Sequence, residues 1–217
     1  MKSLFYFLLF PSVFAQSITI RAGCVGTIRS AQDPTQILGT AFVAGARGRI
    51  VTAAHVVAEG RFSFNGVAIN LAYQLPEHDL AVLEPVCKGC VTCDRPFEFG
   101  DGRKIKPGDK VFYLGWAPDQ GVVIQAHLAE IEATGATLNG KTVIDFFEFN
   151  GSGRPGYSGG PVIATDGAVV AVMREAWAKQ GVRGGVPMMM NRAFSIEPVA
   201  EREGSPPDVP PSPAQGR

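Results

Sequence analysis

The stretch Gly153-Arg154-Pro155-Gly156-Tyr157-Ser158-Gly159-Gly160-Pro161-Val162 places one serine, Ser158, among four glycines. Glycine reaches backbone conformations that other residues avoid, so the amide groups around Ser158 can turn toward a substrate carbonyl. A Gly-rich loop could also be a simple turn. The rest of the chain decides between these interpretations, because it supplies a histidine and an aspartate in segments suited to assist a serine nucleophile.

The histidine lies in Thr52-Ala53-Ala54-His55, directly after the β-like run at residues 49–51. The small residues before His55 allow the turn that carries it to pack closely against a sheet. The other two histidines, His78 and His127, have no such context, and a lone histidine is more often a surface or core residue than a catalyst. His55 is therefore the predicted base.

The aspartate, Asp79, stands at the entry to the apolar run 80–83, which is typical of a buried strand. Alone it could be a turn residue that caps the strand entry. Acyl transfer by a serine needs a base within hydrogen-bond reach and a carboxylate that orients the base. Together the three segments predict a catalytic triad of His55, Asp79 and Ser158.

Short β-like runs separated by glycine and proline cover most of the chain, which predicts an all-β fold with antiparallel strands. Two dipeptides, Asn139-Gly140 and Asp166-Gly167, are strong hairpin-turn signals. Residues 120–136 are interpreted as strand and loop, because Val122, Val123 and Ile124 are β-branched. The predicted strands include residues 17–21, 40–43, 49–51, 61–64, 80–86, 110–115 and 168–173.

Over residues 17–199 the sequence resembles the trypsin-like serine peptidases, and most closely the HtrA-type (DegP-like) exported bacterial proteases. The resemblance rests on Thr-Ala-Ala-His at 52–55, Asp-Leu-Ala-Val-Leu at 79–83 and Gly-Tyr-Ser-Gly-Gly-Pro at 156–161. Residues 106–111 and 166–172 match as well. The resemblance implies two six-stranded antiparallel β-barrels with the active site in the cleft between them.

The resemblance also assigns roles for a secreted serine endopeptidase. His55 would act as general base and then general acid, Asp79 would orient it, and Ser158 would attack the peptide carbonyl. The backbone N–H groups of Gly156 and Ser158 would form the oxyanion hole. Ser152 would lie near the base of the primary substrate pocket and Gly185 on its wall, which favours apolar or small side chains over Arg or Lys. The family implies no metal and no organic cofactor.

Two features depart from the family pattern. Tyr157 stands where pancreatic-type enzymes carry an aspartate that pairs with a newly cut N-terminus, and where HtrA-type enzymes often carry asparagine. We therefore expect no trypsinogen-style activation. HtrA-type proteins generally carry a PDZ domain, whereas only a Pro-rich segment follows Val199 here. We expect a protease domain without PDZ.

The two ends of the chain have distinct compositions. Lys2 precedes an apolar run at residues 4–10 and then Val13-Phe14-Ala15, so residues 1–15 are predicted to be a signal peptide, with a buried first strand as the alternative. Residues 16–200 form the predicted protease domain, secreted or periplasmic and not attached to a membrane. Residues 201–217 are predicted to be a disordered Pro-rich tail, with a ligand for a partner domain as the alternative.

Charge and composition restrict the possible partners. The 217 residues contain 20 Lys plus Arg and 20 Asp plus Glu, and no basic stripe interleaved with aromatic residues. Nucleic acid is therefore an unexpected partner, and protein or peptide substrates are expected. The sequence does not fix the oligomeric state. A non-catalytic binding module on the same scaffold is the alternative to an enzyme.

Four cysteines, Cys24, Cys87, Cys90 and Cys93, permit three disulfide pairings in an exported protein. The spacing of the last three is also compatible with a zinc site completed by Cys24, as in a metal-binding structural protein. Disulfides are the preferred interpretation, because exported proteins fold in an oxidising compartment.

Overall fold

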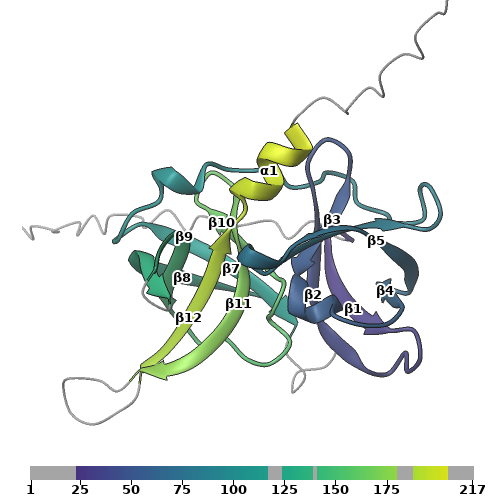
Figure 1. Ribbon diagram of the computed structural model, residues 1–217, viewed down its shortest axis with the longest axis horizontal. Helices are drawn as coiled ribbons and strands as arrows, with labels where there is room; N and C mark the ends of the chain where they lie inside the picture. Colours follow the sequence, from purple (N-terminus) through teal and green to yellow (C-terminus); the bar gives the residue numbers. More distant parts are fainter. Residues whose placement is uncertain (1–22, 117–123, 139–140, 180–187, 205–217) are drawn as a thin grey trace, which may run out of the picture.

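The structure is a computed structural model that describes residues 23–116, 124–138, 141–179 and 188–204. In this part of the chain twelve strands form two closed barrels that lie side by side, each of six antiparallel strands (Figure 1). The predicted all-β double barrel is therefore confirmed. Among the described residues, no helix has the length and apolar character needed to cross a bilayer.

The first barrel closes in the order β1-β2-β3-β6-β5-β4, with β1 paired to both β2 and β4. Alternate residues of each strand face inward, so large apolar side chains such as Ile28, Phe42 and Phe64 fill the interior and are fully buried. Its strands are β1 Val25–Ser30, β2 Ile37–Ala44, β3 Arg49–Ala53, β4 Phe62–Phe64, β5 Val67–Leu75 and β6 Leu80–Pro85.

The second barrel closes in the order β10-β11-β12-β9-β8-β7, which is the same arrangement as in the first barrel. Its interior mixes apolar residues such as Phe149 and Val162 with Tyr113 and Tyr157, all buried. Its strands are β7 Lys110–Trp116, β8 Ile124–Leu138, β9 Lys141–Asn150, β10 Pro161–Ala164, β11 Val169–Lys179 and β12 Met188–Ser195.

The local predictions can be compared with these strands. Asp166-Gly167 forms the turn between β10 and β11, where the Ala168 amide donates to Asp166 Oδ1 over 3.0 Å and Gly167 has a φ of +91° that favours glycine. The predicted strand within 120–136 is confirmed from Ile124 onward and continues to Leu138. The predicted strand at 17–21 and the Asn139-Gly140 turn lie outside the described residues.

Short helical segments complete the fold. Within the described ranges, three are single 3₁₀ turns and one is an α-helix. They are η1 Ala54–Val57, η2 Pro76–His78, η3 Gly102–Lys104 and α1 Glu197–Gly204. The segment η1 contains His55, and Asp79 directly follows η2. Both lie at the same end of the first barrel, because η1 follows β3 and η2 precedes β6, and these strands pair there.

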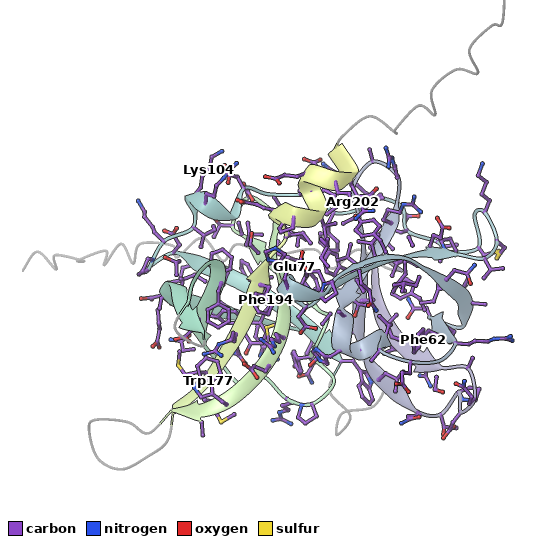
Figure 2. The ribbon with its side chains drawn as sticks, in the orientation of Figure 1. Phe62, Glu77, Lys104, Trp177, Phe194 and Arg202 are labelled. Atoms are coloured by element: carbon purple, nitrogen blue, oxygen red, sulfur yellow. A yellow bond between two sulfur atoms is a disulfide. The ribbon has the colours of Figure 1, made fainter. Side chains whose placement is uncertain are left out.

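Helix α1 corrects the predicted start of the disordered tail. Residues 201–204 are helical, not disordered, because α1 packs against the first barrel. The Tyr73 hydroxyl donates to Glu203 Oε1 over 3.0 Å, and the Arg202 guanidinium, labelled in Figure 2, lies 4.0 Å from the centre of the Tyr73 ring. Residues 205–217 and the predicted signal peptide at 1–15 lie outside the described residues.

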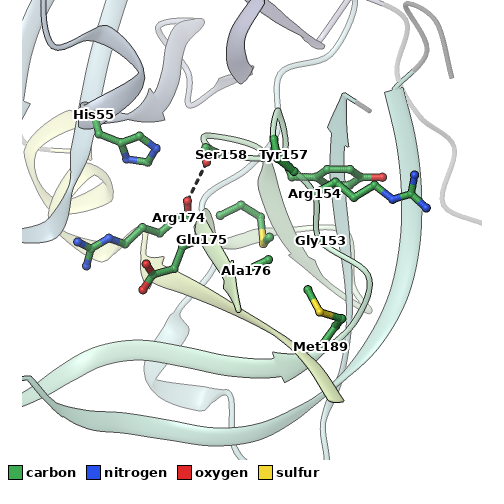
Figure 3. A pocket seen from close by; sticks show the side chains of 11 residues that line it. His55, Gly153, Arg154, Tyr157, Ser158, Arg174, Glu175, Ala176 and Met189 are labelled. Atoms are coloured by element: carbon green, nitrogen blue, oxygen red, sulfur yellow. Dashed lines mark hydrogen bonds between the residues drawn. The ribbon is translucent and has the colours of Figure 1, made fainter. Parts of the chain in front are cut away.

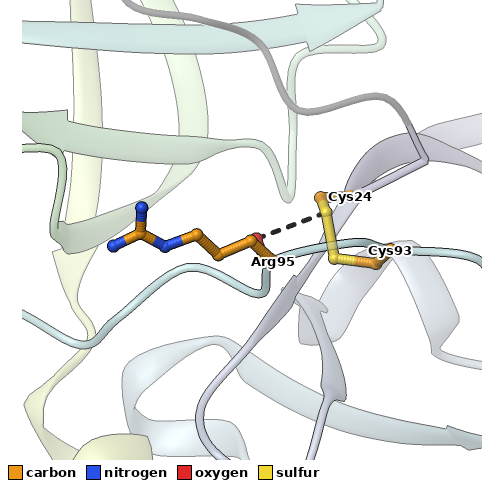
Figure 4. The surroundings of a disulfide bond; sticks show 3 residues. All are labelled: Cys24, Cys93 and Arg95. Atoms are coloured by element: carbon orange, nitrogen blue, oxygen red, sulfur yellow. Dashed lines mark hydrogen bonds between the residues drawn. A yellow bond between two sulfur atoms is a disulfide. The ribbon is translucent and has the colours of Figure 1, made fainter.

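All four cysteines form disulfides, which selects one of the three possible pairings. Cys24 bonds to Cys93 and Cys87 to Cys90. Figure 4 shows the first of these beside the carbonyl oxygen of Arg95, which lies 3.5 Å from Cys24 Sγ. Because no cysteine is left as a free thiol, the alternative of a zinc site built from these residues is wrong.

Candidate active site

His55 and Asp79 meet at the end of the first barrel through a pair of hydrogen bonds to one carboxylate. The His55 backbone amide donates to Asp79 Oδ1 over 3.0 Å, and His55 Nδ1 lies 2.8 Å from Asp79 Oδ2. The backbone is tied as well, since the Ala54 amide donates to the Asp79 carbonyl over 2.8 Å. Asp79 has a φ of +50° at the end of η2. This left-handed turn directs its side chain toward the imidazole.

Ser158 lies on the loop between β9 and β10 of the second barrel and lines the same pocket as His55. Its carbonyl accepts a hydrogen bond from the Thr40 amide of β2 over 2.8 Å, which ties the loop to the first barrel. Its hydroxyl donates to the Arg174 carbonyl over 2.8 Å (Figure 3). A serine hydroxyl carries a single proton, so in this arrangement the proton is directed to Arg174 and not to the His55 ring.

Thr40 holds the serine loop in a way that the sequence analysis missed. This fully buried residue donates its hydroxyl proton to the Gly156 carbonyl over 2.6 Å, and the same hydroxyl oxygen accepts from the Trp116 amide over 2.9 Å. One side chain of the first barrel thus orients a carbonyl group of the serine loop and the end of β7. In the sequence Thr40 is merely a β-branched strand residue, so no local signal marks it.

The amide groups of the loop divide into two sets. Those of Tyr157, Gly159 and Gly160 donate to the carbonyls of Arg154, Met173 and Tyr157 over 2.8–3.0 Å. The hydrogen bonds among the described residues do not engage the amides of Gly156 and Ser158. Position 156 requires glycine, because its φ is +99° and a Cβ atom there would lie 2.6 Å from the Trp116 carbonyl oxygen.

Tyr157 anchors the loop inside the second barrel. Its side chain is 1% exposed, and its hydroxyl donates to Gln125 Oε1 over 3.0 Å. Since this uses the only hydroxyl proton, His127 Nε2, which lies 2.8 Å from the same oxygen, must be the donor in that contact. Burial, and to a smaller extent the charge of Arg154, lowers the pKa of His127 and favours the neutral ring. The ring of Tyr157 lies against Gly115, where a Cβ atom would collide with it.

Two of the three predicted catalytic residues, His55 and Ser158, line a pocket of about 380 Å³. Figure 3 shows His55 near one end of it and Met189 near the other. Ser152, predicted near its base, is exposed and lies outside the lining, because its amide is turned back to the Tyr113 hydroxyl over 3.0 Å. Gly185 lies outside the described residues. The lining consists of His55, Gly153, Arg154, Pro155, Tyr157, Ser158, Met173, Arg174, Glu175, Ala176 and Met189.

Two ion pairs involve charged side chains at this pocket. Arg174 Nε lies 3.5 Å from Asp79 Oδ2, so the carboxylate that faces His55 also faces a guanidinium. Glu175 Oε1 lies 3.1 Å from Arg192 Nη1, and the same guanidinium pairs with Glu148 over 2.9 Å. Glu175, the one carboxylate among the described residues that line the pocket, is therefore already paired.

Residues 39–172 match the family model described as a trypsin-like peptidase domain, which covers more than half of the chain. This chain belongs to the trypsin-like peptidase family. The resemblance predicted from the three motifs is thereby confirmed, and the matched range contains His55, Asp79 and Ser158.

Relatives place this trypsin-like peptidase near the DegP-like proteins. The chain is 28% identical over 158 residues to a probable periplasmic serine endoprotease, DegP-like, of Pseudomonas putida strain W619, covering 69% of this chain and 31% of that protein. A protein of the same description from Bartonella henselae is 28% identical over 172 residues, covering 75% of this chain and 33% of that protein. The chain thus spans about a third of the length of these relatives. The HtrA-type protease AlgW, solved with a decapeptide, shares the fold with a TM-score of 0.64 at 23% identity, covering 85% of this chain and 64% of that one.

In this trypsin-like peptidase the sequence motifs reveal the predicted catalytic residues but not the residues that support the serine loop. The structure pairs His55 with Asp79 and places His55 and Ser158 in the lining of one pocket, and all three lie in recognisable motifs. Thr40 and His127 contact the serine loop from strands of different barrels, and each is separated from it by at least 30 residues. Only folding brings these two residues into contact with the serine loop.

Proposed function

We propose that this trypsin-like peptidase domain is a serine endopeptidase that hydrolyses peptide bonds through an acyl-enzyme intermediate. The observation that carries the proposal is the pair of hydrogen bonds from His55 to Asp79, together with the pocket that His55 and Ser158 both line. A carboxylate on Nδ1 fixes the ring orientation and leaves Nε2 free to act as the base.

The reaction begins with a rotation of the Ser158 hydroxyl from the Arg174 carbonyl to His55 Nε2. Ser158 Oγ then attacks the substrate carbonyl while Nε2 takes the hydroxyl proton, and Asp79 stabilises the resulting imidazolium. The imidazolium returns the proton to the leaving amine, and the C–N bond breaks. Water then attacks the acyl-enzyme by the same route, which releases the carboxylic acid and restores Ser158.

The backbone N–H groups of Gly156 and Ser158 are the proposed oxyanion hole. Both lack a partner among the described residues, whereas three neighbouring amides are engaged. Preorganised donors of this kind each lower the barrier by about 3 kcal/mol. The Thr40 and Tyr157 contacts support this role, because they hold the loop from both barrels.

The proposed substrates are proteins or peptides outside the cytoplasm, and the proposed location is periplasmic or secreted. Two disulfides and relatives that are named periplasmic support such a location. The chemistry derived above uses only residues of this chain, so the proposal includes no cofactor.

The test is covalent labelling with a fluorophosphonate probe together with digestion of a mixed peptide library. We expect the wild-type protein and a Ser152→Ala variant to be labelled and to cut peptides, and a Ser158→Ala variant to do neither. Ser152 is a matched control, because it is an exposed serine six positions before Ser158 and its amide, not its hydroxyl, makes the contact to Tyr113. A folded wild-type protein that is neither labelled nor active would favour the non-catalytic binding module.

A further inference from the structure

Asn191 on β12 is a polar side chain with no partner in the interior of the second barrel. It is 0% exposed, and neither its Nδ2 nor its Oδ1 makes a hydrogen bond among the described residues. A buried polar atom without a partner destabilises a protein by about 1–3 kcal/mol. A functional role can offset such a cost, and the position of Asn191 beside the pocket indicates what that role is.

The Asn191 amide lies directly behind the wall of the catalytic pocket. Asn191 is paired in register with Ala176 of β11, which lines the pocket. A Cβ atom on Gly153, another lining residue, would collide with Asn191 Oδ1 and lie 3.1 Å from the Ala176 side chain. The wall in front of the amide therefore consists of a glycine and an alanine, the two smallest residues. A Cβ atom on Gly151 would collide with the amide nitrogen.

Two adaptable apolar side chains also line the pocket. Met173 and Met189 line the pocket, and Met189 is 44% exposed. Methionine side chains are unbranched and readily change shape around an incoming group. A side chain that enters from Ser158 thus meets these methionines along its stem, and its tip comes to the wall of Gly153 and Ala176. This wall must shift for the tip to reach the Asn191 amide, which is 0% exposed.

We infer that Asn191 determines the primary specificity, and that the pocket selects a carboxamide side chain, Gln or Asn, on the residue whose carbonyl Ser158 attacks. This inference rests on the proposed function. A carboxamide carries both a donor and an acceptor, so it can satisfy both unpaired atoms of Asn191 in one reciprocal pair. An apolar side chain would leave both atoms unsatisfied.

Charged side chains fit the pocket less well. A Lys or Arg side chain would need a carboxylate, and Glu175, which supplies the one carboxylate of the described lining, is already paired with Arg192. An acidic side chain could accept from Asn191 Nδ2 but would leave Oδ1 without a donor. The sequence analysis favoured apolar or small side chains because it placed Ser152 at the base. The structure places Asn191 behind that part of the wall instead.

The test uses fluorogenic peptides that differ only at the residue before the cleaved bond, compared as Gln against Met and Asn against Leu, because each pair is similar in size. We expect kcat/KM of the wild-type protein to favour each carboxamide by about 10-fold or more. An Asn191→Leu variant should reverse both preferences. An Asn191→Asp variant should instead accept Lys, because it adds a buried negative charge.

Fluorophosphonate labelling of Ser158 separates the two possible failures. A labelled wild-type protein that prefers Met and Leu, or a labelled Asn191→Leu variant with unchanged ratios, would overturn the specificity inference alone. A folded wild-type protein that is not labelled would overturn the proposed function and the inference with it. The wild-type ratios need no variant, so a preference for Met and Leu would overturn the inference even where a substitution at this buried position prevents folding.

Discussion

The two barrels share one strand order but differ in what they bury. In the first barrel the buried polar side chains near the site are short hydroxyls, such as Thr40 and Thr52, which bond to backbone groups. The second barrel buries larger polar side chains, namely Tyr113, Tyr157 and Asn191. The same topology thus serves two purposes. The first barrel fixes the acid–base pair at its end, and the second uses polar groups in its interior to hold a loop and shape a pocket.

The largest expected effect tests the acid–base pair of the first barrel. An Asp79→Asn substitution keeps the shape of the side chain but favours the wrong tautomer of His55, so kcat/KM should fall about 10⁴-fold. Steady-state kinetics with a cleavable peptide measures the change. Glu77→Gln is the matched control, because Glu77 is an exposed carboxylate two positions earlier on η2, and its activity should stay near that of the wild type. Similar losses in both variants would remove Asp79 from the triad.

The next largest effect concerns the contribution of the two disulfides to the stability of the first barrel. Their cysteines lie in this barrel or in the segment that follows it. The Cys24–Cys93 bond closes a loop of 69 residues, whereas Cys87–Cys90 spans only three. By loop-closure entropy, replacing the first pair with alanine should lower the free energy of unfolding by about 4 kcal/mol and the second by about 2 kcal/mol. Denaturant titration of the two double variants measures both. Equal losses would contradict the entropic explanation.

Thr40 tests the link between the barrels. A Thr40→Val substitution leaves the Gly156 carbonyl and the Trp116 amide without their hydroxyl partner, so kcat/KM should fall about 10-fold and stability by about 1–3 kcal/mol. Thr52→Val is the control. Thr52 is equally buried, but its hydroxyl donates to the Thr40 carbonyl within the first barrel. We expect it to lose stability with a smaller loss of activity. The reverse order would argue against a role of Thr40 in holding the serine loop.

The smallest effect concerns the polar interior of the second barrel and depends on pH. Because burial lowers the pKa of His127, the folded protein binds this proton less readily than the unfolded chain, whose histidine titrates near pH 6.5. The contribution of the neutral ring to stability is therefore complete above about pH 6.5 and is lost as the pH falls through the lowered folded value. The ring is partly exposed, so solvent screening limits the effect to a few tenths of a kcal/mol.

Unfolding measured at pH 7.5 and pH 5.5 tests this effect. A His127→Gln variant should lose less stability on acidification than the wild type, whereas a His78→Gln variant, with no contact to Tyr157, should behave like the wild type. An unchanged pH dependence in the His127→Gln variant would show that this histidine does not titrate with folding.

Much of the fold and the core of the site could be predicted because the information is local. Each predicted catalytic residue is positioned by residues close to it in the sequence. These are the glycines around Ser158, the alanines before His55 and the apolar strand after Asp79. Alternating β-like runs and the Asp166-Gly167 turn likewise predicted the strands. The tail boundary was wrong because the helicity of residues 201–204 depends on Glu203 meeting Tyr73 of β5, a contact between distant parts of the chain.

The sequence by itself determined the family, the all-β class and the three residues of the predicted triad, since motifs of adjacent residues carry these properties. Only the tertiary structure decided the disulfide pairing, the supporting contacts of Thr40 and His127, and the residue behind the pocket wall, Asn191 in place of Ser152. The physical reason is the same in each case. Barrel closure brings side chains from distant strands within hydrogen-bond distance, and no pattern along one strand records which of them will meet.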